Sequence, residues 1–347
     1  MAEYGSAYKE AGVDLQAAEG LVSRIKAMAA RTYTKGVITD IGLFGGMFRL
    51  DVNATADPVL VSSTDGVGTK LKLAFQMNKH DTVGVDLVAM NVNDIAVHGA
   101  KPLFFLDYFA VGKLDVEVAE TVVSGIASGC RQAECALLGG ETAELPGFYA
   151  PGEYELSGFS VGLVDNSKIV DGSSIGVGNK VIGLASSGLH SNGYSLVRKI
   201  IEDQGHDLDQ ELPGSGRKLG EILLDPTRIY VKTILNLVRD FDIRGMVHVT
   251  GGGFYDNLPR VLPKGVRVRL DFESWPKQRI FQWLKDQGEL SWEEMLQVFN
   301  CGIGLMLIVD KTEYEDILIR LNGLKEEAWL IGEVQSRKQD QEQVDIR

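Results

Sequence analysis

The 347-residue sequence predicts an α/β protein, of the α+β type, built from two domains. Apolar residues make up 44% of the chain, which is enough for sizeable cores. Short apolar strands alternate with amphipathic helices in both halves, and the polar, glycine-containing segment 165–178 separates them. We therefore expect a domain at residues 1–168 and a second domain at residues 169–347.

The N-terminal half should begin with an amphipathic helix at residues 14–30, because its apolar residues recur at helical spacing: Leu15, Ala18, Val22, Ile25 and Ala29. A short apolar strand at 58–62 comes next and leads into a glycine-rich turn. A helix is expected at 82–97, because Gly99 and Pro102 would end it. Residues 103–111 are almost continuously apolar, which is typical of a buried strand.

Asp115 is the expected N-cap of the next helix, whose apolar stripe carries Ala119, Val123, Ile126 and Cys130. Strands at 136–138 and 156–164 complete the N-terminal half. In the C-terminal half, apolar runs and alternation predict strands at 180–185, 245–249, 266–272, 301–309 and 329–334, with helices at 194–202, 227–239 and 314–321. The charged tail 335–347 is expected to fray.

Composition narrows the class of protein. The net charge of −13 argues against general nucleic-acid binding, which needs excess Lys and Arg. The sequence has no run of about 18 apolar residues and no secretion signal at its start, so we expect no membrane partner. Cys130, Cys135 and Cys301 lie in apolar segments, as buried thiols of a reducing compartment would. These features favour a cytoplasmic protein.

Three acids stand at the ends or edges of predicted elements. Asp65 follows a strand and precedes the turn Gly66–Lys70, Asp94 lies on a mostly apolar helix, and Glu141 follows two glycines. If these carboxylates converge, a cation must offset their repulsion, and Mg²⁺ is the ion that shares its shell between carboxylates and phosphates. Lys70 and the backbone N–H groups near Gly66 and Gly68 could then hold phosphate oxygens.

Each acid also has a simpler interpretation. Asp65 could be an ordinary turn residue, Asp94 could pair with a buried cation, and Glu141 could cap an element. The metal site and these structural roles stay open on spacing alone.

The C-terminal half has a second polar cluster. Residues 186–194, SSGLHSNGY, lie between a strand and a helix, so hydroxyl, amide and N–H groups there could hold an anionic substrate. Thr250-Gly251-Gly252-Gly253 repeats this arrangement, and an ordinary capped loop is the alternative in both places. His190 and His248 could transfer protons near neutral pH, although His248 in an apolar strand could equally be a satisfied core residue.

Several strings resemble one family closely, in the family's order and along nearly the whole chain: YKEAGVD at 8–14, DGVGTK at 65–70, HDTVGVDLVAMNVND at 80–94, PLFFLDYFAVGKLDV at 102–116, GGETAELP at 139–146, SGLHSNGYSLVR at 187–198, and the segment 250–263. On these strings the chain is similar to the phosphoribosylformylglycinamidine cyclo-ligases, also called aminoimidazole ribonucleotide synthetases.

The resemblance implies an ATP-dependent ring closure in purine synthesis. ATP would phosphorylate the formyl amide oxygen of formylglycinamidine ribonucleotide, and the internal amidine nitrogen would displace phosphate from the resulting iminophosphate. Aminoimidazole ribonucleotide, ADP and phosphate would leave. The implied fold has an N-terminal mixed-sheet domain that dimerises through its strands and a C-terminal α/β domain, so a homodimer is expected.

The resemblance also implies roles for particular residues. ATP would contact Thr64, Asp65, Gly66, Gly68, Thr69, Lys70, Asp94, Gly139, Gly140, Glu141 and Thr142. Mg²⁺ would be held by Asp65, Asp94 and Glu141. The substrate side would be Ser191, Asn192, Gly193, Thr250, Gly251, Gly252 and Gly253. Lys70, His190 and His248 would be the catalytic groups.

Two rival functions share these acids. A small-molecule kinase of the same superfamily would keep them, but it should lack the cyclo-ligase strings of the second half. A non-catalytic ATP-binding regulator should have lost at least one of Asp65, Lys70, Asp94 and Glu141, and all four are present.

Overall fold

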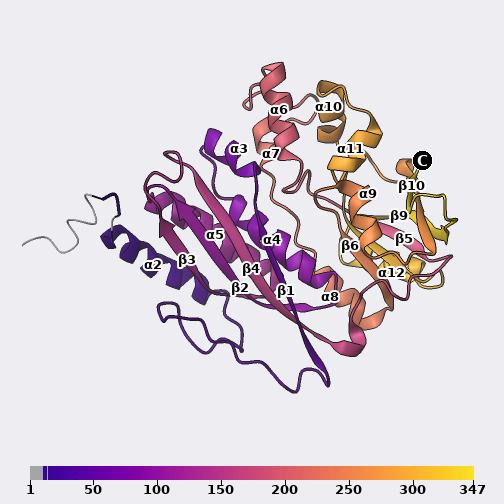
Figure 1. The fold of residues 1–347 in the computed structure, drawn as a ribbon, viewed down its shortest axis with the longest axis horizontal. Coiled ribbons are helices and arrows are strands. Elements are labelled where there is room, and N and C mark those ends of the chain that lie inside the picture. Colours follow the sequence, from indigo (N-terminus) through magenta and orange to yellow (C-terminus); the bar gives the residue numbers. More distant parts are fainter. Residues whose placement is uncertain (1–10, 14) are drawn as a thin grey trace, which may run out of the picture.

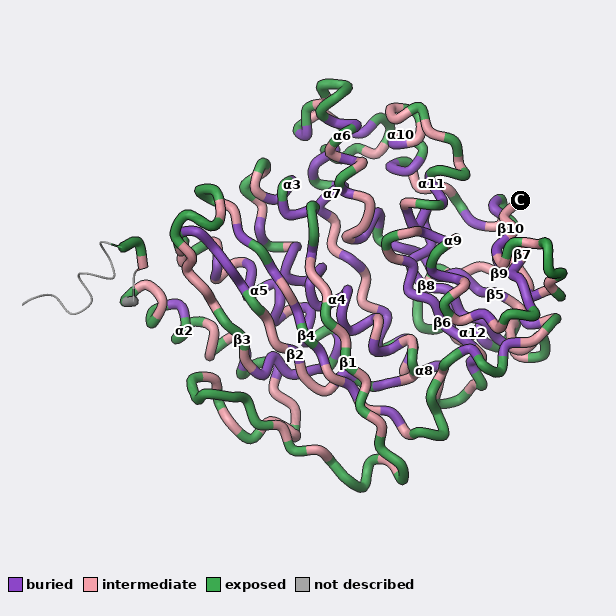
Figure 2. Tube along the Cα trace, in the orientation of Figure 1, coloured by how far each residue is buried: buried purple, intermediate pink, exposed green. Residues whose placement is uncertain are grey.

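The computed structural model describes residues 11–13 and 15–347, so most of the expected motif at 8–14 lies outside the described residues. Two lobes lie side by side in Figure 1. One lobe contains the first half of the chain and a four-stranded sheet, and the other contains the second half and a six-stranded sheet. In Figure 2 the buried segments concentrate inside each lobe, whereas the long connection below the first sheet is largely exposed.

The first sheet has the order β1-β4-β2-β3, with β1 (Pro58–Gly66), β2 (Lys101–Val111), β3 (Ala136–Glu144) and β4 (Tyr154–Asp165). Strands β2 and β3 are parallel, whereas β4 pairs antiparallel with both β1 and β2. Helix α4 (Val83–Ala96) packs against β1, β4 and β2, and helix α5 (Val116–Ala133) packs against α4 and β3. Helix α2 (Leu15–Ala30) packs on α5 and β3.

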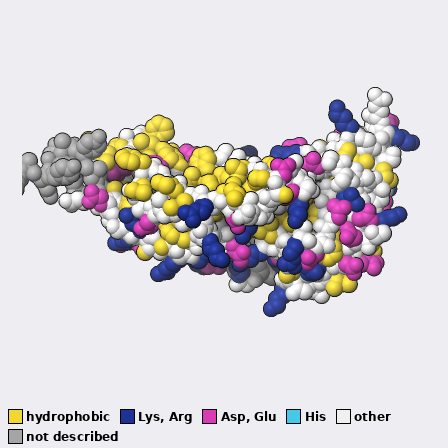
Figure 3. Space-filling view, turned by 90° about the horizontal axis from the view of Figure 1, so that it is seen from below, with side chains coloured by type: hydrophobic (Ala, Val, Ile, Leu, Met, Phe, Trp, Pro, Cys, Tyr) yellow, Lys and Arg dark blue, Asp and Glu magenta, His cyan; other side chains and the backbone are white. Residues whose placement is uncertain are grey.

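Because these helices cover one face, the other face of the first sheet stays open. The side chains of β1 and β4 alternate between the two faces, and Leu60 and Phe159 point to the open one, with 61% and 45% of their surface exposed. Tyr108 on β2 is exposed as well. Figure 3 shows apolar side chains gathered along this side of the N-terminal lobe.

The second sheet has the order β10-β7-β9-β5-β8-β6. Its strands are β5 (Lys180–Ala185), β6 (Ile243–His248), β7 (Val266–Leu270), β8 (Ile303–Val309), β9 (Ala328–Ser336) and β10 (Val344–Ile346). Strand β8 lies inside the sheet with all seven residues buried, as its apolar sequence predicts. The helices of this lobe are α6 (Tyr194–Gln204), α7 (Leu219–Leu223), α8 (Val231–Asp240), α9 (Gly253–Asn257), α10 (Arg279–Gln287), α11 (Trp292–Val298) and α12 (Tyr314–Gly323).

Most expected elements are confirmed, with boundaries moved by a few residues. Asp115 caps α5 as expected, because its Oδ1 accepts hydrogen bonds from the N–H groups of Glu117 and Val118. All three cysteines are buried and free. Among the described helices, none has the length and apolar run needed to cross a bilayer.

Three expectations are wrong. The stretch after residue 138 is not a loop, because β3 continues to Glu144 by pairing with β2. The tail does not simply fray: β10 pairs with β7, and Asp345 on β10 lies 3.1 Å from Arg269. In α2, Ala29 and Ile25 of the expected stripe face the core, but Val22 is 39% exposed and Leu21 is buried in its place.

Helices α3 (Lys70–Gln76), α7, α10 and α11 were not expected from the sequence. They are short, and their apolar residues do not extend over enough turns to reveal a helical period. Helix α3 matters for the site, because it starts at the last residue of the glycine-rich turn.

Candidate active site

A cavity of about 560 Å³ lies where the glycine-rich turn of the first lobe meets the 186–194 loop of the second. The turn contributes Asp65, Gly66, Gly68 and Thr69, and the loop contributes Ser191 and Asn192. The turn also contacts helix α6, which follows the loop, since the hydroxyl groups of Thr69 and Ser195 lie 3.2 Å apart. Gly68 has φ +72°, a conformation that favours glycine at this position in the turn.

A second cavity, of about 360 Å³, lies further along helix α4. Met90 of α4 lines the first cavity, and Asp94, one turn later, lines the second. His248 and Thr250 line the second cavity from the C-terminal lobe, and Ser62 and Ser63 line it from β1. The two cavities therefore lie about one turn of α4 apart, and this region where the two lobes meet is here called the crevice.

Asp94 is close enough to Asp65 to disfavour the charge of Asp65. Burial raises the pKa of Asp65, and the nearby Asp94 carboxylate raises it further. A hydrogen bond from the Gly66 N–H (2.8 Å) and the proximity of His248 act in the opposite direction. A carboxylate whose charge is disfavoured in this way fits a place where a divalent cation binds.

Asp94 and His248 form a hydrogen-bonded pair between the lobes. His248 Nδ1 lies 2.8 Å from Asp94 Oδ1, and its Nε2 lies 3.4 Å from Asn93 Nδ2. The His248 side chain is buried while that of Asp94 is 44% exposed. The pair can orient the imidazole and hold a proton at Nδ1 next to the second cavity.

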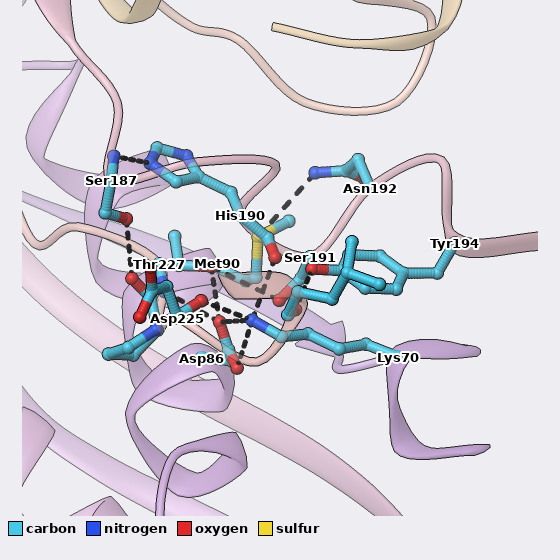
Figure 4. Close-up of polar contacts among 12 residues, drawn as sticks. Lys70, Asp86, Met90, Ser187, His190, Ser191, Asn192, Tyr194, Asp225 and Thr227 are labelled. Carbon is cyan, nitrogen blue, oxygen red and sulfur yellow. Dashed lines mark hydrogen bonds and ion pairs between the residues drawn. The ribbon is translucent and has the colours of Figure 1, made fainter. Parts of the chain in front are cut away.

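The Lys70 side chain lies in the interior of the protein. It is fully buried, and Nζ lies 2.9 Å from Asp86 Oδ1, 3.0 Å from the His190 carbonyl oxygen and 2.7 Å from the Asp225 carbonyl oxygen. Figure 4 shows this arrangement. Burial lowers the pKa of Lys70, and Asp86 opposes that shift. All three ammonium hydrogens are therefore used within the chain, and a contact between Lys70 and a phosphate stays a prediction.

His190 is also buried, and it does not line either cavity of the crevice. It adopts φ +62°, its Nε2 accepts a 3.3 Å hydrogen bond from the Ser187 N–H, and its carbonyl holds Lys70. Burial lowers the pKa of His190 well below its usual value, and nearby His248, Lys70 and Arg228 lower it further. The imidazole is therefore neutral, and proton transfer by His190 stays a prediction.

Glu141 does not join Asp65 and Asp94 within one chain. It aligns with Tyr108 on β2, which aligns with Ser157 on β4 and then with Gly66 on β1. Three strand spacings of about 4.8 Å place it roughly 14 Å from β1. Among the residues described, no group of three or more His, Cys, Asp or Glu side chains is arranged to hold a metal. The neighbouring residues of β3 that were also expected to contact ATP do not line either cavity: Gly139, Gly140 and Thr142.

The Thr250–Gly253 segment approaches the 186–194 loop. A Cβ atom on Gly251 would lie 3.4 Å from Asn192 Oδ1, so the Gly251 backbone lies close to the Asn192 side chain. Gly252 has φ +87° and precedes the short helix α9. Asn257 fixes the turn by donating to the carbonyl oxygens of Gly251 and Gly253 at 3.1 and 2.7 Å. Thr64 lies on the open side of β1, and Gly193 is the N-terminal flank of α6.

The sequence patterns did not identify two basic residues that line the cavities, Lys72 and Arg260. Lys72 lines the first cavity two residues after Lys70, and its ammonium is 2.6 Å from Glu153. Arg260 lines the second cavity near Asn257 and has no partner among the described residues. No sequence pattern indicated Lys72, because helix α3, which turns residues 70 and 72 to different sides, is too short to show a helical period.

Residues 46–164 match the family described as AIR synthase related protein, N-terminal domain, and residues 176–345 match its C-terminal domain. Solved structures share this fold. Thiamine-monophosphate kinase from Stenotrophomonas maltophilia is 18% identical, with a TM-score of 0.68 over 94% of this chain and 95% of that one. The hydrogenase maturation protein HypE of E. coli is 19% identical, with a TM-score of 0.67 over 94% and 93%. The chain is thus an AIR synthase related protein by fold and by sequence.

Curated relatives are far closer in sequence, and each is a phosphoribosylformylglycinamidine cyclo-ligase. The protein from Oleidesulfovibrio alaskensis is 64% identical over 97% of this chain and 96% of its own length. The one from Geobacter metallireducens is 56% identical over the full length of both. The chain belongs to the phosphoribosylformylglycinamidine cyclo-ligase family, and it is an ATP-dependent ligase of purine biosynthesis.

Proposed function

We propose that this enzyme closes the imidazole ring of formylglycinamidine ribonucleotide and releases aminoimidazole ribonucleotide, ADP and phosphate. The observation that carries the proposal is the crevice between the lobes, which joins the Asp65–Thr69 turn to the Ser191–Asn192 loop. Full-length similarity to cyclo-ligases supports the choice of substrate.

The chemistry divides into two steps. The formyl amide oxygen attacks the γ-phosphorus of ATP, and the P–O bond to ADP breaks. The internal amidine nitrogen then attacks the former amide carbon, the C–O bond breaks with loss of phosphate, and the nitrogen loses a proton. Because phosphate is a better leaving group than an amide oxygen, and because the nucleophile is tethered, each step becomes feasible.

The nucleotide is proposed to bind on the side of the first cavity that is lined by the Gly66–Lys72 segment, and the side lined by Ser191 and Asn192 is left to the substrate. Support comes from the Gly66–Thr69 backbone, the cation Lys72 and the adjacent Asp65. Mg²⁺ would bind to Asp65 and Asp94, the two site carboxylates that lie together, and would neutralise charge on the phosphates. In place of Lys70, we propose Lys72 as the side chain that contacts phosphate.

The formylglycinamidine ribonucleotide is proposed to occupy the substrate side, with Ser191, Asn192 and the Thr250–Gly253 segment around it. Arg260 is free among the described residues and lines the second cavity, so it is suited to the substrate phosphate. His248, held by Asp94, is our choice for the group that moves a proton, because it lies at that cavity and His190 does not.

A homodimer is proposed to form through the open face of the first sheet. The exposed Leu60, Tyr108 and Phe159 support it, because a monomer rarely leaves such a row of apolar side chains uncovered. Glu141 aligns with Tyr108 on this sheet, so we propose that Glu141 acts as a ligand in the partner's site. We further propose residues 1–168 and 169–347 as the domains, and the cytoplasm as the compartment.

The proposal is tested by incubating the protein with formylglycinamidine ribonucleotide, ATP and Mg²⁺ and measuring aminoimidazole ribonucleotide. Asp94→Asn and Glu141→Gln should each abolish turnover in a folded dimer. If Glu141 acts across the dimer, mixing the two inactive variants should restore activity in the heterodimers. A wild type without product would refute the function, and a mixture that stays inactive would refute the role of Glu141 in the partner's site.

A further inference from the structure

A buried chain of hydrogen bonds runs from the first lobe to the substrate loop of the second. Asp86, in the first turn of α4, has no exposed surface. Its Oδ1 accepts hydrogen bonds from Thr227 N at 2.7 Å and Thr227 Oγ at 2.6 Å, besides that from Lys70. Its Oδ2 lies 2.8 Å from the Lys70 ammonium. The carboxylate is thus fixed between a cation of one lobe and a loop of the other (Figure 4).

Thr227 extends this chain to the first cavity. Its Oγ lies 3.2 Å from Ser191 Oγ, and Ser191 lines the cavity. A threonine hydroxyl has one hydrogen, and the charged Asp86 carboxylate takes it. The Ser191 hydroxyl must therefore donate its own hydrogen to Thr227. Asp86 sets the direction of all these hydrogen bonds, because an ionised carboxylate can accept hydrogen bonds but cannot donate them.

This direction has a chemical consequence for the ligand. With its hydrogen committed to Thr227, Ser191 Oγ can only accept a hydrogen bond from a bound molecule. We propose that Asp86 and Thr227 are positioning residues, which orient Ser191 as an acceptor for an N–H or O–H group of the substrate. The inference rests on the proposed function, since an amidine and a ribose both supply such donors.

The roles of the described residues differ accordingly. Ser191 would touch the substrate, whereas Thr227 and Asp86 act through it. Lys70 completes the arrangement: it pairs with Asp86 and also binds the carbonyl oxygens of His190 and Asp225, the neighbours of Ser191 and of the Thr227 loop. The Lys70–Asp86 pair thus holds the substrate loop against the first lobe.

The test compares Thr227→Val with Thr227→Ser. Valine keeps the shape of the threonine side chain and the hydrogen bond from the backbone N–H to Asp86, but it frees the Ser191 hydroxyl. Serine keeps the hydroxyl that links Asp86 to Ser191. We expect Thr227→Val to raise KM and Kd for formylglycinamidine ribonucleotide about 10-fold, the effect of one well-placed hydrogen bond. Thr227→Ser should stay within about 2-fold of wild type, and KM for ATP should change little. Thr121→Val, the same change on the surface of α5, is the control.

Combining Thr227→Val with Ser191→Ala distinguishes the positioning of Ser191 by Thr227 from a general effect of Thr227 on the structure. Ser191→Ala alone should also raise Kd about 10-fold, and Thr227→Val should add nothing in that background, because both remove the same contact. An unchanged Kd in Ser191→Ala would overturn the proposal even if Thr227→Val does not fold. Effects that multiply in the double variant would overturn it as well.

Measuring Kd without ATP keeps this inference separate from the function. A wild type that binds the ribonucleotide without turning it over would refute the proposed reaction while the Kd values still test Ser191. A wild type that does not bind the ribonucleotide would refute both.

Discussion

At Asp65 the fold holds a carboxylate where its charge is disfavoured by burial and by Asp94. Such an arrangement favours the binding of a cation, because the cation offsets the repulsion between the two carboxylates. Asp65 therefore lowers the stability of the protein without ligands while it favours cation binding.

Asp65→Asn should therefore raise the melting temperature of the protein without ligands. The amide can still accept the Gly66 hydrogen bond, but it carries no charge next to Asp94. The same variant should lose the increase in melting temperature that Mg²⁺ and ATP give to the wild type. Differential scanning fluorimetry measures both effects, and a variant that melts lower and still responds to Mg²⁺ and ATP would contradict the prediction.

Asp107 predicts a pH dependence of stability. Burial raises its pKa to about 7 from an ordinary 3.8. Between these two values the folded protein keeps a proton that the unfolded chain has lost, so the free energy of unfolding falls as pH rises through this window. Asp107→Asn should remove this part of the fall, worth a few kcal/mol at most. Urea unfolding between pH 5.5 and 8 measures it, and parallel curves for variant and wild type would show that Asp107 is not the cause.

At the scale of elements, the contact between α4 and α5 depends on glycine. A Cβ atom on Gly84 would lie 2.3 Å from the Val122 carbonyl oxygen and 2.5 Å from Ile126 N. These are backbone atoms, so no side chain can move aside. Because α4 carries Asp86, Met90 and Asp94, the closeness of this crossing also sets the position of the crevice.

Gly84→Ala should destabilise the protein by about 1–3 kcal/mol, because it overpacks the crossing. Gly20→Ala is the matched control, since Gly20 lies in α2 with nothing within 4 Å of the added carbon. That change should stabilise by about 0.5–1 kcal/mol through helix propensity. Denaturant titration compares them, and equal stabilities for the two variants would exclude the crossing as the cause.

At the scale of the whole molecule, the open sheet face determines the proposed assembly. Phe159→Glu places a charge among the exposed apolar side chains of β4 and should shift the homodimer to monomers. Ile319→Glu, at a residue of α12 that is 69% exposed, should leave the mass unchanged. Light scattering during size-exclusion chromatography distinguishes these outcomes. A dimeric Phe159→Glu variant would show that the interface lies elsewhere.

Sequence patterns anticipated the elements whose apolar residues extend over several turns or strands, such as α4, α5 and β8. They failed where pairing decided the structure: β3 continues through two glycines because β2 offers hydrogen bonds, and β10 forms because β7 is adjacent. In α2 the predicted stripe included Val22 where the structure buries Leu21, because both residues are apolar and only the position of α5 selects between them.

The candidate site divides in the same way. The sequence by itself determined the family, the two-domain α/β organisation, and the segments 65–69 and 191–192 that meet at the crevice, because these are properties of local residue order. Only the tertiary structure decided that Lys70 is buried against Asp86, that Asp94 meets His248, and that Glu141 lies three strands from Asp65. The reason is physical: burial, ion pairing and strand order depend on residues far apart in the chain, and local spacing carries no information about which of them become neighbours.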